Sequence, residues 1–381
     1  MKIKNNFTAI ACRVILPFIF ATVFMVLFAG CKLDLVIENP YEEIDWAAFG
    51  RYKADLHAHT THSDGYYSPH VVVDRYYELG YRILAIADHN RVSYPWQEFS
   101  SLEVSERTYR RLDDGQLDDI PHEDSFVYED RDPESLGMIA ISGNEVSQHH
   151  HMGSLFNAHE DRNRELGTVS ETLEAIAEKG GLGILYHPGS YNGTHGSRPY
   201  YPIDWYVEIF QRNDHLVGME AYNNGWQHNP GNLHRWDSTL TRVMPDRPVW
   251  GFANDDFHGG TMGHSWNVFL LPELTKEEVR KGIENGLSYF IYAPEAHDGP
   301  PAPEIHSITV DQENATIYID ASGYHYIEWI SNGKSIHFGE YIHLHDFPGI
   351  DTYVRANIYQ SQYASDQFRA VTMTQPFGIR R

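Results

Sequence analysis

Two histidines separated by one residue give the first sign of chemistry in this sequence. His57 and His59 lie in the segment Asp55-Leu56-His57-Ala58-His59, whose composition favours a β-strand. Because strand side chains alternate between the two faces, both imidazoles point the same way and can share one cation. The pair alone is weak evidence, since two histidines on one face of a strand are also found simply exposed or hydrogen-bonded.

Residue types that bind metals also follow four later apolar segments, 82–87, 138–143, 183–186 and 249–253. They are His89, Glu145, His187 and the pair Asp256 and His258. In α/β folds, functional groups gather at the C-terminal ends of parallel strands. Imidazole and carboxylate ligands without thiolate suit zinc, manganese or iron.

Helix-like segments between these apolar runs predict an α/β domain with parallel strands from residue 53 to about residue 290. In the segment 170–179, Ser170 is a candidate N-cap, and Gly180 and Gly181 can end the helix. The polar insertion between His89 and Glu145 includes the acidic segment 112–119. That insertion is either a lid over the site or a solvated surface excursion.

The sequence changes character after the proline-rich segment 299–303. Short alternating runs predict strands, and Asn332-Gly333 predicts a hairpin turn. We therefore expect residues 304–381 to form a small antiparallel β-sandwich of immunoglobulin-like type. Trp329 is expected in its core and not on a carbohydrate-binding surface, because a small sandwich needs large side chains inside.

The N-terminus has the plan of a secretory signal. Basic residues precede an apolar stretch from Val14 to Phe28, which ends in Ala29-Gly30-Cys31. This ending resembles a bacterial lipoprotein cleavage site, with Cys31 as the lipidated first residue of the mature chain. A retained N-terminal anchor is the alternative. The expected organisation is a signal peptide (1–30), a linker (31–50), a hydrolase barrel (51–298) and the β-sandwich (304–381), exported to the periplasmic side or outer surface of a membrane.

The overall charge restricts the partners of this chain. The formal net charge is -24 at pH 7, which repels a phosphate backbone and argues against extended nucleic-acid binding. A local basic pocket can still bind a small anion. Contact with a membrane is expected only through the N-terminal lipid.

Taken together, the motifs resemble those of the PHP (polymerase and histidinol phosphatase) superfamily. The resemblance spans most of residues 53–258 and implies a distorted (β/α)7 barrel, a variant of the eight-stranded plan, with two or three divalent ions of zinc, manganese or iron. The matching segments, in the family's order, are Asp55-Leu56-His57-Ala58-His59-Thr60 with Ser63-Asp64-Gly65, Ala87-Asp88-His89-Asn90, Ser142-Gly143-Asn144-Glu145-Val146, Tyr186-His187-Pro188 and Asp256-Phe257-His258.

The resemblance also implies which residues bind each metal ion. The first ion would take His57, His59, Glu145 and Asp256, with Glu145 bridging to the second. The second would add His187 and one histidine of the run 149–151, for which His151 is preferred to His150. The third would take Asp64, His89 and His258; in a two-metal site these three would instead hydrogen-bond the ligands.

The function implied is hydrolysis of a small phosphate ester, a monoester or a diester, by a hydroxide that bridges metals in a trinuclear site. Glu145, Asp256 and Arg198 are the candidate catalytic residues, and Arg198 and Arg91 are candidates for binding the phosphate. The alternatives are an amidohydrolase-type metal enzyme acting on another substrate and a non-enzymatic surface binding protein. The Asp256-x-His258 ending and the bridging position of Glu145 favour the PHP-type enzyme.

The lipoprotein prediction is tested by changing Cys31 to Ser. We expect the variant to be released from the membrane or mislocalised, because it cannot carry the lipid. Membrane fractionation with intact-mass measurement checks this. A wild-type chain that is unlipidated and cut elsewhere, or left uncut, would contradict the prediction.

Overall fold

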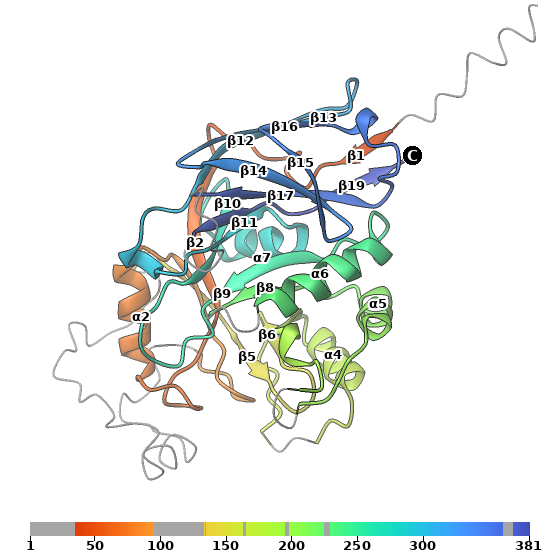
Figure 1. The fold of residues 1–381 in the computed structure, drawn as a ribbon. Helices are drawn as coiled ribbons and strands as arrows, with labels where there is room; N and C mark the ends of the chain where they lie inside the picture. Colours follow the sequence, from red (N-terminus) through yellow and green to blue (C-terminus); the bar gives the residue numbers. More distant parts are fainter. Residues whose placement is uncertain are drawn as a thin grey trace, which may run out of the picture.

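The described part of the chain folds as a mixed α/β protein with three β-sheets (Figure 1). A computed structural model describes residues 35–94, 96, 133, 135–162, 165–194, 198–224, 229–360 and 369–381. Within these ranges, no helix combines the length and the hydropathy needed to cross a membrane. Cys31 and the acidic segment 112–119 lie outside the described residues.

Two groups of strands carry the predicted site. Part of the largest sheet contains three parallel strands, β2 (Gly50–Ala58), β3 (Ile83–Ile86) and β4 (Ile139–Ile141). A separate five-stranded sheet contains β5 (Gly143–Val146), β6 (Met152–Leu155), β7 (Leu182–Leu185), β8 (Leu216–Asn223) and β9 (Trp250–Asn254). The four apolar runs that precede the candidate ligands are therefore strands, as predicted.

The two groups of strands meet at their C-terminal ends. Parallel bridges pair Ala58 with Phe257 and His89 with Glu145. The backbone N–H of His59 donates to the carbonyl of Phe257 over 2.8 Å. These contacts bring the ends of β2, β3 and β9 to the same place as β5.

The expected succession of parallel strands holds only in part. β5, β6 and β7 pair antiparallel, and parallel pairing returns at β7, β8 and β9. Five residues connect β5 to β6, which allows a hairpin, whereas a parallel crossover needs a dozen residues or more. The sequence did not predict this hairpin, because the connection 147–151 contains none of the glycine, asparagine, aspartate or proline residues that usually mark a turn.

Five α-helices of the described residues lie beside these sheets (Figure 1). They are α2 (Pro69–Glu78), α4 (Val169–Glu178), α5 (Ile203–Arg212), α6 (Asn229–Val243) and α7 (Lys276–Asn285). The prediction that Ser170 caps α4 is wrong. The cap is Thr168, whose hydroxyl accepts from the backbone N–H of Glu171 over 3.1 Å and so satisfies one of the free N–H groups at the start of the helix. Gly180, at φ 71°, ends the helix as expected.

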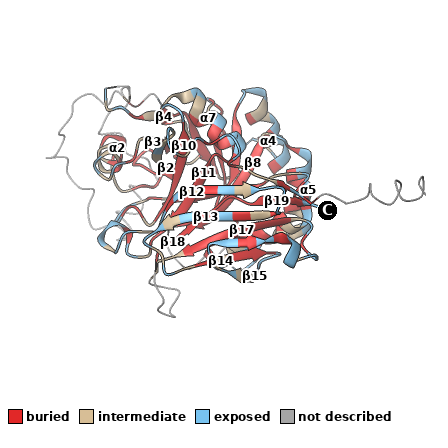
Figure 2. Ribbon diagram, turned by 90° about the horizontal axis from the view of Figure 1, so that it is seen from above, coloured by how far each residue is buried: buried red, intermediate tan, exposed pale blue. Residues whose placement is uncertain are grey.

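The C-terminal strands are antiparallel, as predicted, and divide between two sheets. β12 (Glu304–Asp311), β13 (Thr316–Ser322) and β16 (Tyr341–His343) form one sheet. The remaining strands are β14 (Tyr326–Ser331), β15 (Lys334–Phe338), β17 (Tyr353–Tyr359), β18 (Val371–Met373) and β19 (Phe377–Arg380). Figure 2 shows β17 buried along most of its length, whereas β12 and β13 alternate between buried and exposed residues.

The second C-terminal group is hydrogen-bonded into the largest sheet and does not form a sheet of its own. β18 pairs with β11 (Ser288–Tyr292), which pairs through β10 (Ser265–Leu271) with β2. The segment expected as a linker contains β1 (Val36–Glu38), which pairs with β19. The largest sheet thus contains strands from both sides of the proline-rich segment 299–303.

Local predictions for the C-terminal segment agree with the structure. Asn332 and Gly333, at φ 51° and 65°, connect β14 and β15, and positive φ at both residues is what a type I′ hairpin turn requires. Trp329 is 0% exposed and its indole donates to the carbonyl of Gly339. It is a core residue, as expected.

A buried ion pair joins α6 to the C-terminal strands. The guanidinium of Arg355 in β17 donates through Nε and Nη2 to the two carboxylate oxygens of Asp237 in α6, each over 2.8 Å. Tyr353 donates its hydroxyl to the same carboxylate, also over 2.8 Å. Both charges are more than nine-tenths buried, so removing one partner leaves the other uncompensated.

We therefore expect Asp237→Ala to lower the free energy of unfolding by roughly 3–5 kcal/mol, the usual cost of breaking a buried pair. Arg212→Ala, which removes an exposed pair with Glu208, should cost at most about 1 kcal/mol. Urea unfolding followed by circular dichroism measures both. Equal effects of the two substitutions would contradict this account of the contact between α6 and β17.

Candidate metal centre

Nine side chains converge where the strand ends meet. They fall into four overlapping groups in which the ligand atoms of each group lie within 4.8 Å of one another. Each of the nine metal ligands predicted from the sequence belongs to at least one of these groups. They are His57, His59, Asp64, His89, Glu145, His151, His187, Asp256 and His258.

The first group forms the floor of the cluster. The Nε2 atoms of His57 and His59 are 3.1 Å apart. Asp256 Oδ1 lies 3.1 Å from the first Nε2 and 3.2 Å from the second. Both histidines are fully buried at the end of β2, so three donor atoms face one point from which water is largely excluded.

Glu145, in β5, lies at the centre of the cluster. Its Oε1 is 2.8 Å from His151 Nδ1 and 3.1 Å from His187 Nε2. Its Oε2 is 2.8 Å from His89 Nδ1 and 3.4 Å from His59 Nε2. Because its two oxygens face different imidazoles, one carboxylate can serve two cations at once.

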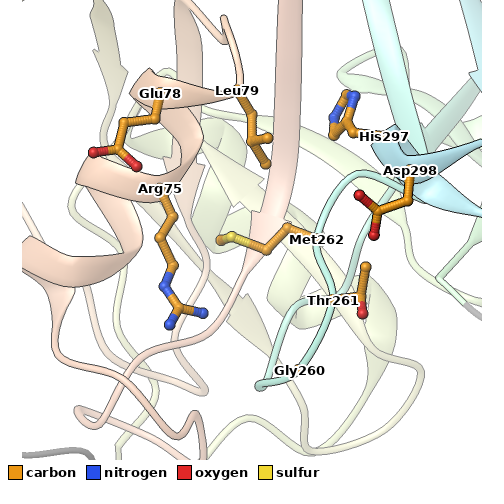
Figure 3. Close-up of a pocket in the computed structure, with 8 residues that line it drawn as sticks. All are labelled: Arg75, Glu78, Leu79, Gly260, Thr261, Met262, His297 and Asp298. Carbon is orange, nitrogen blue, oxygen red and sulfur yellow. The ribbon is translucent and has the colours of Figure 1, made fainter.

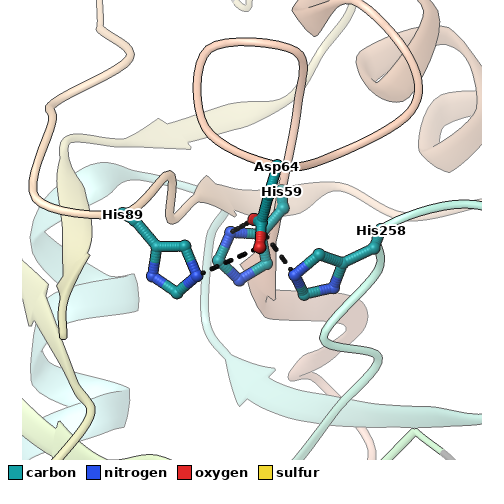
Figure 4. A group of neighbouring side chains, drawn as sticks. All are labelled: His59, Asp64, His89 and His258. Carbon is teal, nitrogen blue, oxygen red and sulfur yellow. Dashed lines mark ion pairs between the residues drawn. The ribbon is translucent and has the colours of Figure 1, made fainter. Parts of the chain in front are cut away.

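The remaining group brings Asp64 together with His59, His89 and His258 (Figure 4). Asp64 is directed between the imidazoles of His59, His89 and His258. Its Oδ1 is 3.2 Å from His258 Nε2, and its Oδ2 is 3.5 Å from His89 Nε2. The carboxylate therefore curls back over the same strand ends that carry the other ligands.

Without cations, some of the histidines take up protons between the carboxylates. Burial alone would lower the pKa of His57, but nearby carboxylates, led by Asp256, raise that pKa well above its ordinary value. Burial is likewise outweighed at His89, where Glu145 and Asp64 raise the pKa to about 10. The carboxylates of the cluster thus carry negative charge that positive ions, whether protons or metal cations, can compensate.

Other members stay unprotonated at neutral pH. Burial lowers the pKa of His59 to about 4 and that of His187 to about 3. The pKa of Glu145 lies well below its ordinary value because surrounding imidazoles, led by His151, outweigh the effect of burial. Neutral imidazoles and ionised carboxylates are the forms that bind metal ions.

Two buried atoms add to the fit. Asp256 Oδ1 and His89 Nδ1 have no well-aligned hydrogen bond among the described residues, and such atoms are rare in folded proteins unless something else satisfies them. The backbone is strained at the same place, since His187 and Asp256 have φ of 29° and 46°. Left-handed conformations outside glycine are uncommon and often mark functional sites.

Asp88 belongs to the motif Ala87-Asp88-His89-Asn90 and holds the turn before Asp64. Its carboxylate accepts from the backbone N–H and the hydroxyl of Thr60, over 2.8 and 2.7 Å. It also accepts from the hydroxyls of Ser63 and Ser93, each over 2.6 Å. Hydrogen bonds to Asp88 therefore fix the turn 60–63 at both of its ends.

Tyr186 supports His57 in a similar way. The two rings stack with centroids 3.7 Å apart, and the tyrosine hydroxyl donates to the carbonyl of Leu56. Close packing requires glycine at position 153, where a Cβ would lie 2.2 Å from the hydroxyl oxygen of Tyr186. Tyr186 is part of the sequence motif Tyr186-His187-Pro188, but the sequence does not reveal that its ring stacks on His57.

The geometry distinguishes the three consecutive histidines. His151 alone of the three belongs to a candidate metal group among the described residues. His150 stacks on Tyr191 at 4.0 Å and places its Nε2 3.1 Å from the hydroxyl of Tyr206. His149 places its Nε2 3.1 Å from the carbonyl of Leu166. The preference for His151 over His150 therefore agrees with this arrangement.

The two arginines predicted from the sequence differ in position. Arg198 Nη1 lies 3.2 Å from His187 Nδ1, so its guanidinium borders the cluster. The charge of Arg91 instead acts on Glu160. Burial would raise the pKa of Glu160, but hydrogen bonds from Arg162 and the charge of Arg91 lower it below its ordinary value. Of the two arginines, Arg198 is better placed to contact a molecule bound at the cluster.

Two cavities lie away from these residues. One, of about 250 Å³, lies between α2 and the loop 260–262 and is lined by Arg75, Leu79 and His297 among others (Figure 3). A second, of about 430 Å³, shares Leu79 and His297 with it. None of the nine clustered residues lines either cavity, so neither cavity is part of the candidate metal site.

Comparison with known proteins gives structural similarity at low sequence identity. No family model and no curated protein matches the chain. A two-domain protein from Bacteroides vulgatus, which contains a predicted PHP-like metal-dependent phosphoesterase, is similar over 87% of this chain and 88% of its own, with 14% identity and a TM-score of 0.46. A candidate metal-dependent phosphoesterase from Bifidobacterium adolescentis is similar over 60% of this chain and 94% of its own, with 17% identity and a TM-score of 0.36. Scores this low carry no argument about function, which must come from the residues of this chain.

The cluster predicts how metal content responds to substitution. We expect roughly three equivalents of divalent metal in protein purified without chelator. His89→Ala should lose close to one equivalent, and Glu145→Gln more, because a neutral amide weakens two positions at once. Elemental analysis of the purified variants measures this. His149→Ala is the matched control and should keep the wild-type content; unchanged content in His89→Ala would exclude His89 as a ligand.

Proposed function

We propose that this cluster is the metal centre of a PHP-type hydrolase that cleaves a small phosphate ester outside the cytoplasm. The observation that carries the proposal is the convergence of nine donor side chains, from separate strand ends, into overlapping groups suited to metal ions. The order of these residues along the chain matches the motifs of the family that the sequence resembles. A distorted barrel would explain why strand ends from two sheets meet there.

The proposed ligand sets are those that the family resemblance implies. The first and third agree with groups in the structure, whereas the second combines His151 and His187, which belong to two groups that share Glu145. The first ion would be held by His57, His59 and Asp256, the second by His151 and His187, and Glu145 would bridge them. The third would be held by Asp64, His89 and His258. Divalent cations held by these residues would lower the pKa of bound water and polarise phosphoryl oxygens.

The exposure of the ligands indicates the side from which a substrate approaches. His57 and His59 are fully buried, whereas the side chains of His258 and Asp256 are 31% and 18% exposed. The ester would therefore enter over these last two residues. The ionised carboxylates of Asp256 and Glu145 would hold the cations. The guanidinium of Arg198, which lies beside His187, would bind a phosphoryl oxygen.

The proposed activity is tested by measuring phosphate release from a panel of mono- and diesters, with wild-type protein, with chelator and after metal is restored. We expect turnover that chelator abolishes and added Zn²⁺ or Mn²⁺ restores. Glu145→Gln should lose roughly 100-fold or more, the scale of removing one electrostatic contact from an active site. Turnover of amides but not of phosphate esters would favour an amidohydrolase, and metal binding without any turnover would favour a binding protein.

The role of Arg198 is tested separately on the ester that turns over best. Arg198→Ala should raise KM by roughly 10-fold or more, because a charge-assisted contact to the phosphate contributes about 1.5–3 kcal/mol. Arg91→Ala is the comparison and should have a smaller effect. A larger increase for Arg91→Ala would reassign the phosphate contact to that residue.

A further inference from the structure

A buried glutamate in β8 contacts two of the predicted ligands without belonging to any motif. Glu220 is 0% exposed. Its Oε1 is 2.9 Å from His57 Nδ1 and accepts from the side-chain amide of Asn254, also over 2.9 Å. Its Oε2 accepts from the backbone N–H of His187 over 2.7 Å and from the side-chain amide of Asn223 over 2.9 Å.

These contacts determine the form of the carboxyl group. The backbone N–H of His187 and the amides of Asn223 and Asn254 can only donate at these positions. A proton on Glu220 could therefore be accepted only by His57. A carboxylate whose four acceptor positions all receive hydrogen bonds satisfies every group present. Glu220 is thus placed as an acceptor of the His57 Nδ1–H.

The hydrogen bond to Glu220 decides which nitrogen of His57 can bind a metal. With the proton held on Nδ1, the lone pair of His57 lies on Nε2, the atom that faces His59 and Asp256 at 3.1 Å. An outer carboxylate that fixes the tautomer and the ring orientation in this way raises the basicity of the ligand nitrogen. His258 has a comparable partner, since its Nδ1 lies 2.8 Å from the backbone carbonyl of Asp256.

The second oxygen of Glu220 acts on a different group of ligands. It holds the backbone of His187, which has the strained φ of 29°. A left-handed conformation in a residue other than glycine persists only where surrounding contacts impose it. The hydrogen bond from His187 N–H to Glu220 is such a contact, and it directs the imidazole toward Glu145 at 3.1 Å.

We propose that Glu220 is the positioning residue shared by the first and second metal positions, acting through His57 Nδ1 and the backbone of His187. This rests on the proposed metal centre and adds to it a carboxylate that touches no metal. It gives one side chain control over two ligand groups. The third position, formed by Asp64, His89 and His258, does not depend on it.

The test is Glu220→Gln, which keeps the shape of the side chain but turns its amide nitrogen toward groups that donate. Either a hydrogen bond is lost or His57 takes its proton on Nε2, where it blocks metal binding. We expect Zn²⁺ affinity at two positions to fall by roughly 10- to 100-fold, measured by competition with a chromophoric chelator. Glu208→Gln, which alters an exposed carboxylate that belongs to none of the metal groups of the described residues, is the control and should keep wild-type affinity.

The outcomes separate this proposal from the one on which it rests. A wild-type protein that binds no Zn²⁺ would overturn both. Wild-type binding with unchanged affinity in folded Glu220→Gln would overturn the role of Glu220 alone. The loss of Zn²⁺ affinity in the double variant Glu220→Gln/His57→Ala should be smaller than the sum of the losses in the two single variants. A purely structural role of Glu220 would make the two losses additive.

A measurement on the wild type covers the case in which Glu220→Gln does not fold. In Zn²⁺-loaded protein with ¹⁵N-labelled histidine, the His57 resonances, assigned by comparison with His57→Ala, should show a protonated Nδ1 and a metal-bound Nε2. A metal-bound Nδ1 would overturn the proposal.

Discussion

The structure of the site depends on one buried carboxylate surrounded by imidazoles. Glu145 is 1% exposed, and five histidine nitrogens lie within 3.5 Å of its two oxygens. An isolated carboxylate is costly to bury, so its neighbours must supply positive charge, by protonation or by metal ions. This requirement explains why strands from different parts of the chain must end together, and why the backbone bridge from His89 to Glu145 lies inside the cluster.

Much of the site could be predicted from the sequence because its residues follow apolar strands. The nine candidate ligands come together, and His151 is oriented toward Glu145 whereas His150 is not. Glu220 could not be found in this way. It lies in the middle of an eight-residue strand that is buried throughout, and its importance comes from groups that only the folded chain brings to it.

The fold was less predictable, for reasons of pairing and not of composition. Strand positions and the Asn332-Gly333 turn follow from local residue patterns. Sheet membership does not, because β18 is a three-residue strand whose pairing with β11 connects segments about 80 residues apart. The antiparallel pairing of β5 with β6 depended on a connection of five residues, and the N-cap Thr168 lay two residues before the expected one.

The close contact at position 153 has a consequence for how this protein can vary. Gly153 carries no functional group, yet any Cβ there would displace the hydroxyl of Tyr186, whose ring supports His57. A change to alanine, the mildest available, would therefore disturb a ligand without touching it. Selection should act on Gly153 as strictly as on the histidines, and a survey of natural variants would find it constant for a reason that its own chemistry cannot reveal.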